Sequence, residues 1–99
     1  GSPEMQARAA DRLRNLTLAM FEQQESEIDY YLSLEPGFYS AVRGEKDIAL
    51  QVADRLQRIT TFYLPGDETL ETLSTRLDSL RSRVEEKERA IVDLGRFSF

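Results

Sequence analysis

The sequence predicts an all-α fold, an up-down-up bundle of three long helices with coiled-coil-like packing. Two Pro-Gly pairs, at residues 36–37 and 65–66, divide the 99-residue chain into three segments of nearly equal length, and such pairs mark helix ends. Apolar residues recur at helical spacing in every segment. Val and Ile, which favour strands, are few. Short connections make neighbouring helices antiparallel, which gives the up-down-up order.

The first four residues, Gly1-Ser2-Pro3-Glu4, are typical of the remnant left when a purification tag is removed. They carry no weight in the fold prediction. Met5 is then either a native start or an internal residue of a larger protein. The bundle over residues 5–95 is one domain, so small that its single core must suffice or a partner must extend it.

The first predicted helix covers residues 5–34. Gln23, Gln24 and Glu27 interrupt its apolar stripe where another apolar layer is expected. The stripe otherwise keeps intervals of three or four residues. Its members are Ala9, Leu13, Leu16, Met20, Ile28 and Tyr31.

The second predicted helix covers residues 36–64. Pro36 suits the first position of a helix, where its missing N–H is no loss. One glycine inside a helix costs about 1 kcal/mol relative to alanine, an amount that packing can offset. We therefore expect one continuous helix that tolerates a bend at Gly44. Its apolar face consists of Ile48, Ala49, Val52, Leu56, Ile59 and Tyr63.

The third predicted helix covers residues 67–94 and has the clearest pattern. Asp67 is placed to cap its first turn and Gly95 to end it, and residues 96–99 form a tail outside the bundle. Lys87 occupies one apolar position, where it either extends its charged end from the edge of the seam or specifies register. The heptad positions are Leu70, Leu73, Leu77, Leu80, Val84, Lys87, Ile91 and Leu94.

The core is expected to form where the three stripes meet. The residues that we predict to be mostly buried are Leu13, Leu16, Met20, Val52, Leu56, Ile59, Leu73, Leu77, Leu80 and Val84.

The charge pattern agrees with this topology. The first helix begins with arginines and ends with acidic residues, whereas the third begins acidic and becomes basic. In the up-down-up order these two helices are parallel, so opposite charges lie side by side. The net charge of −5 disfavours nucleic-acid binding, and an acidic surface disfavours binding to anionic membranes.

The sequence offers little catalytic chemistry. It contains no His and no Cys, which removes imidazole and thiolate groups as bases, nucleophiles and metal ligands. The acidic residues Glu22, Glu25 and Asp29 share one helical face, but such a run is typical of a solvated surface. We therefore predict no enzyme activity, no cofactor and no metal. With no apolar run of about 18 residues and no signal peptide, a cytoplasmic location is expected.

Aromatic residues gather at one predicted end of the bundle. The first turn and the end of the third helix come together there, and they bring six aromatic side chains with them. These residues either close the core or form a surface that binds a partner, because tyrosine is favoured at interfaces. The candidate partner-binding residues are Tyr30, Tyr31, Phe38, Tyr39, Phe97 and Phe99.

These observations favour a non-enzymatic protein–protein interaction module: an adaptor, regulatory or chaperone-like subunit of a larger assembly. The alternative is a structural coiled-coil segment or spacer of a larger protein. A spacer should have a featureless surface, whereas an adaptor should expose an apolar patch of several hundred Å². We expect a protein partner or self-association, for which a two-fold dimer is the commonest arrangement, and neither nucleic-acid binding nor a membrane span.

Overall fold

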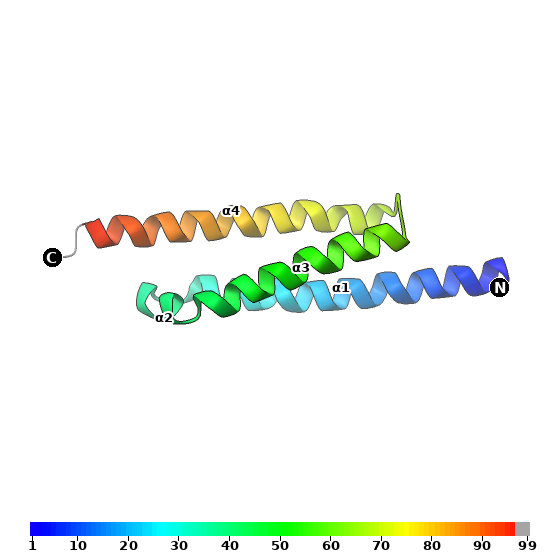
Figure 1. Ribbon diagram of the computed structural model, residues 1–99, viewed down its shortest axis with the longest axis horizontal. Coiled ribbons are helices and arrows are strands. Elements are labelled where there is room, and N and C mark those ends of the chain that lie inside the picture. The colour runs from blue at the N-terminus through cyan, green and yellow to red at the C-terminus, as the bar shows by residue number, and fades with distance from the viewer. Residues whose placement is uncertain (97–99) are drawn as a thin grey trace.

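Helices account for nearly all of the chain in the computed structural model, which describes residues 1–96. Of these residues 91% are helical, and none lies in a strand. Three helices are long: α1 (Pro3–Ser33), α3 (Arg43–Tyr63) and α4 (Glu68–Arg96); α2 (Pro36–Ala41) is short. α1 and α4 run parallel and α3 runs antiparallel to both (Figure 1), which confirms the predicted all-α bundle. The bundle measures 67 × 19 × 15 Å.

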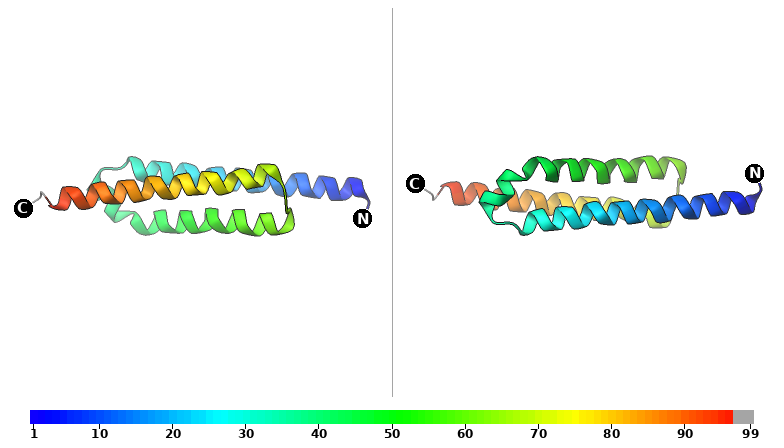
Figure 2. Two further views of the ribbon diagram at one scale, coloured as in Figure 1. Left: turned by 90° about the horizontal axis from the view of Figure 1, so that it is seen from above. Right: turned by 90° about the horizontal axis from the view of Figure 1, so that it is seen from below.

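α1 begins earlier than predicted, because Ser2 caps it. The Oγ of Ser2 accepts a hydrogen bond from the backbone N–H of Met5 at 3.2 Å, and Pro3 occupies the first turn. This end of α1 projects past the ends of α3 and α4 (Figure 2). Residues 3–12 are exposed except for the half-buried Ala10, and we call this segment the overhang.

The second segment is two helices rather than the single one that we expected. The break falls at Val42, whose backbone (φ −105°, ψ 12°) leaves the helical region. Its N–H bonds to the carbonyls of Phe38 and Tyr39, and its own carbonyl accepts from Lys46, so the break leaves these backbone groups paired. Gly44 lies two residues on, and its poor helix propensity weakens this turn. The break turns α2 so that Tyr39 enters the core.

The connection between α3 and α4 follows the prediction. Gly66 has a φ of +76°, which glycine adopts without strain, and Pro65 precedes it as in a type II turn. Asp67 then caps α4, because its Oδ1 accepts a hydrogen bond from the N–H of Leu70 at 3.1 Å. The Nε of Arg14 donates to the other carboxylate oxygen at 2.7 Å. This hydrogen bond holds the pKa of Asp67 below its ordinary value.

The core consists of two adjoining clusters along the bundle. In both, α4 supplies leucines or valine at its predicted heptad positions, and these are buried as expected. One cluster contains Phe21, Ala53, Leu70, Leu73 and Leu77. The other contains Ile28, Ala49, Leu80 and Val84.

The core prediction was wrong for most of the residues that it named on α1 and α3. α1 turns Thr17 and Phe21 inward, each one position along from a residue of the predicted stripe. The hydroxyls of Thr17 and Thr60 bond to each other at 3.0 Å inside the bundle. The predicted core residues that are exposed are Leu16, Met20 and Ile59, and those that are half-buried are Leu13, Val52 and Leu56.

Ion pairs fix the register between α1 and α4 as the charge pattern predicted. They lie along the whole contact, which makes a shift by one turn unfavourable because it would separate several pairs at once. The pairs are Arg14–Asp67, Arg76–Glu25 and Arg83–Asp29.

We expect Leu77→Ala to lower the free energy of unfolding by about 2–5 kcal/mol, because it leaves a cavity among buried side chains. Leu16→Ala is the matched control, and it should cost well under half as much because Leu16 is exposed. Urea denaturation of dilute protein measures both. Equal losses would contradict the assignment of the core.

Candidate interaction surface

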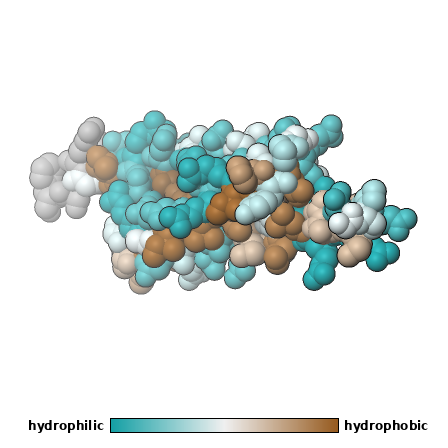
Figure 3. Space-filling model, turned by 45° about the vertical axis from the view of Figure 1, so that its right-hand side comes forward, coloured by the Kyte–Doolittle hydropathy of each residue, from teal (hydrophilic) through white to brown (hydrophobic). Residues whose placement is uncertain are grey.

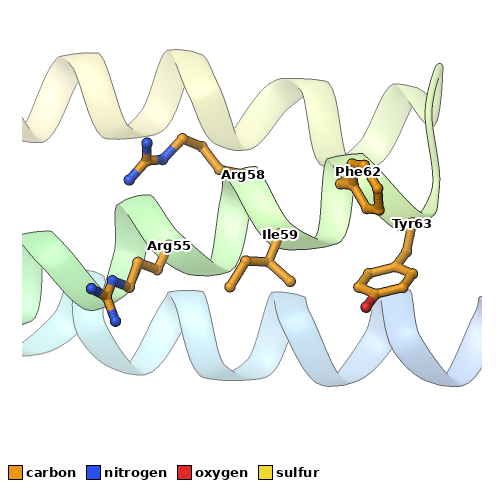
Figure 4. A pocket seen from close by; sticks show the side chains of 5 residues that line it. All are labelled: Arg55, Arg58, Ile59, Phe62 and Tyr63. Atoms are coloured by element: carbon orange, nitrogen blue, oxygen red, sulfur yellow. The ribbon is translucent and has the colours of Figure 1, made fainter.

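Large apolar side chains lie exposed on one side of the bundle, along α1 and α3. On α3, Phe62 is 79% exposed, Tyr63 65% and Ile59 56%, and on α1 Leu16 is 59% exposed. Helical spacing places Met5 and Met20 on the same side of α1 as Leu16, and Ile48 on the same side of α3 as Ile59. Phe62 lies on the side of α3 away from α1 (Figure 4). The other exposed residues, together with the groove between them, form the surface that we call the α1/α3 face.

This exposure results from the side that α3 turns toward its neighbours. Apart from Lys46, the residues that α3 buries are small, namely Ala49, Ala53 and Thr60, and the larger Ile48 and Ile59 face outward. Small buried residues let helices approach closely, and the closer approach leaves the larger stripe no room inside.

A groove of about 320 Å³ runs between α1 and α3 at the centre of this face. Its walls are apolar except for the guanidinium of Arg55 and the hydroxyls of two threonines. Figure 4 shows Arg55, Ile59 and Tyr63 in one row on the side of α3 that faces α1, with Arg58 and Phe62 on the other side. The groove is lined by Leu13, Leu16, Thr17, Met20, Val52, Arg55, Leu56, Ile59 and Thr60.

The apolar area is large for so small a protein. Tyr63 alone exposes roughly 100–160 Å², given the usual surface area of such a residue. With the exposed Leu16, Met20, Ile48 and Ile59, the apolar area of the face is on the order of several hundred Å², the size of patch that is often functional. Figure 3 shows apolar side chains gathered in a band on one side of the molecule, extending toward the end from which α1 projects.

Charge changes sign along the same face. Arg8 and Arg12 lie on the overhang and Arg55 beside the groove, and none of them forms an ion pair with a described residue. Toward the other end, Glu27 on α1 and Glu45 on α3 are exposed and likewise unpaired within the described chain. The face is therefore basic at one end and acidic at the other.

The predicted aromatic end of the bundle is present in part. Tyr30 and Phe38 are exposed, and Tyr39 is fully buried. Tyr31 is half-buried, and its ring packs edge-on against that of Tyr30 with 5.8 Å between the ring centroids. Burial gives Tyr39 a role in packing rather than in contact with a partner. Two of the predicted partner-binding residues, Phe97 and Phe99, lie outside the described residues.

Tyr39 belongs to a polar network that joins α2, α3 and α4. The Oε1 of Glu88 accepts hydrogen bonds from the Tyr39 hydroxyl at 3.0 Å, from Nε of Arg43 at 3.0 Å and from Nζ of Lys46 at 3.2 Å. Burial tends to raise the pKa of Glu88, but the bonds from Lys46 and Tyr39 outweigh it and leave the pKa below its ordinary value. Burial and the bond to Glu88 raise the pKa of Tyr39.

Lys87 has a role that neither sequence interpretation named. Its Nζ donates to the carbonyl oxygen of Leu34 at 2.6 Å and lies 5.7 Å from the centre of the Tyr39 ring. Leu34 is the C-cap of α1, so the ammonium satisfies a carbonyl at the negative end of that helix. Lys87 thus ties α4 to the end of α1.

Tyr63 and Ile48 were missing from the predicted site. A signal for them was present in the sequence: α3 carries large apolar residues at 48, 52, 59 and 63 and alanines at 49 and 53. A helix with one face of large apolar residues and another of small ones is expected to have neighbours on both sides.

Comparisons with protein families, with curated proteins and with solved structures found no match. Within the described chain, no group of three or more acidic residues is arranged to hold a metal ion. None of the described helices combines the length and hydropathy needed to cross a bilayer.

We expect Glu88→Gln to lower the melting temperature at neutral pH, and this deficit should narrow on acidification. Because the folded-state pKa of Glu88 is depressed, its contribution to stability is present above about pH 4.5, its ordinary pKa, and is lost as the pH falls through the folded value. Thermal unfolding between pH 7 and pH 3 tests this. Glu85→Gln, an exposed change on the same helix, is the control. A deficit that stays constant over that range would contradict the network.

Proposed function

We propose that this protein is a non-enzymatic protein–protein interaction module that binds through the α1/α3 face. The observation that carries the proposal is that Ile48, Ile59 and Tyr63 of α3 are exposed, while the apolar residues that α3 buries fully are the alanines 49 and 53. A free domain would gain stability from the reverse arrangement, since burial of apolar area is the main favourable term in folding. A covered face removes this discrepancy.

The face suits a helical partner. A groove lined with aliphatic residues between two antiparallel helices accepts the apolar stripe of a third helix, as in other helix-in-groove complexes. Tyr63 at one end and Arg55 beside the groove are of the types that contribute most to binding energy. The role of adaptor or regulatory subunit follows from this mode of binding.

A spacer is the second candidate, supported by the elongated shape of 67 × 19 × 15 Å. A spacer holds other parts of an assembly at a fixed distance, and this role does not require its sides to differ. The concentration of apolar area on one side favours the interaction module. The exposed Tyr30 and Phe38 are the described residues through which the predicted aromatic end would add to binding.

We expect the double variant Leu16→Gln/Ile59→Gln to lose binding of its protein partner about tenfold or more while keeping its helical circular-dichroism signal. The tagged chain serves as bait both for lysate of the source organism and for added untagged chain. Captured protein is quantified against wild type.

The control is Val92→Gln/Leu94→Gln on α4, whose residues are 54% and 58% exposed and so match Leu16 and Ile59. This control should bind as wild type does. Equal binding by both double variants, or capture of neither a lysate protein nor the untagged chain by wild type, would refute an interaction through this face and favour the spacer.

A further inference from the structure

We propose that the partner that covers the α1/α3 face is a second copy of this chain, bound antiparallel across a two-fold axis. α1 then packs on α1 of the second copy and α3 on its α3. The interface therefore consists of two stacked pairs of helices. The inference rests on the proposed use of this face. It adds the identity of the partner, the direction in which it binds and the register.

The area of the face matches that of a stable dimer. Residues 5–31 of α1 span roughly 40 Å at the usual helical rise, and the bundle is 19 Å wide. The overhang is only one helix wide, so the footprint covers roughly 600–700 Å² on each copy. Specific protein–protein interfaces bury about 600–1,000 Å² per partner.

The overhang determines the direction. Residues 3–12 extend about 15 Å past α3 and α4 as a single exposed helix (Figure 2). With no tertiary packing, this end of α1 opens more easily than the packed part of the helix. In an antiparallel pair the overhang of each copy lies on the far half of the other copy. In a parallel pair both overhangs would project from the same end and stay uncovered.

The apolar residues set the register. Thr17 and Thr60 are hydrogen-bonded and so lie at the same height, which places Ile59 level with the midpoint between Leu16 and Met20. An axis at this height brings Leu16 against Met20 of the second copy and Ile59 against its own equivalent. Met5 then lies opposite Tyr30 of the second copy, and both are exposed in the single chain.

The charges agree with the same register. With the axis at this height, Arg8 lies within one residue of the position opposite Glu27 of the second copy, and Arg55 lies across from Tyr63. Arg8, Glu27 and Arg55 have no ion-pair partner among the described residues, so each is free to pair across the interface. The ring of Tyr63 offers Arg55 a cation–π contact. The reversal of charge along the face thus becomes complementarity across the axis.

Single-cysteine crosslinking tests direction and register, since the chain contains no Cys. With a short bismaleimide crosslinker, we expect Ile59→Cys to form a covalent dimer, and Val92→Cys on α4 to remain monomeric. A mixture of Met5→Cys and Tyr30→Cys should crosslink between the two chains, whereas Met5→Cys alone should not. Crosslinking of Met5→Cys with itself would overturn the antiparallel arrangement.

Sedimentation equilibrium tests the second copy itself. Wild type should dimerise, and Arg8→Glu/Arg12→Glu should raise the dissociation constant about tenfold at low salt, because the two-fold axis repeats each lost contact. Adding Glu27→Arg to that variant should restore dimerisation. A circular-dichroism spectrum of each variant shows that it has folded.

Two outcomes would overturn the second copy as the partner. One is a strictly monomeric wild type at high concentration. The other is a dimer that none of the charge changes affects. If the monomeric chain still captures a lysate protein and loses it with Leu16→Gln/Ile59→Gln, the proposed function stands and only the identity of the partner is wrong.

Discussion

The close packing of α3 through its alanines is the constraint on which the rest of the structure depends. Ala49 and Ala53 lie in separate core clusters, so α3 approaches its neighbours through a small side chain in each, with the half-buried Leu50 packed beside them. With α3 in this rotation, Ile48 and Ile59 face solvent or another molecule. The core that remains is narrow, and α4 supplies most of its volume. A small core and a large apolar outer side therefore have one cause.

Polar contacts complement this packing by fixing position rather than by adding bulk. The Thr17–Thr60 hydrogen bond sets the height of α3 against α1, and the carboxylate of Glu88 joins α2, α3 and α4 at the opposite end. Lys87 holds the end of α1. Such groups have fewer acceptable arrangements than apolar ones, so they select one register of the bundle. The geometry of the α1/α3 face follows from that register.

Periodicity in the sequence was enough to predict α4 but not the orientation of α1 and α3. Leucines at both heptad positions of α4 meet two neighbours, so only one rotation buries them, and the prediction was correct from Leu70 to Val84. α1 and α3 each carry apolar residues on two sides, and periodicity does not indicate which side meets the core. The break at Val42 depends on a tertiary contact, the entry of Tyr39 into the polar network, which no local pattern encodes. The aromatic end was inferred from topology. Topology does not say which of its side chains are buried, and Tyr39 is buried and contributes to packing rather than to a binding surface.

The overhang makes coverage of the face detectable by proteolysis. Proteases cleave chains that open locally, and a terminal helix segment without neighbours opens far more often than the packed bundle. The peptide bonds after Arg8 and Arg12 lie in this segment, so trypsin reaches them readily in the free chain. A partner bound to the face stabilises these helical turns and protects the two peptide bonds from trypsin. The half-life of the first twelve residues under trypsin is then a simple measure of how much of the protein is assembled.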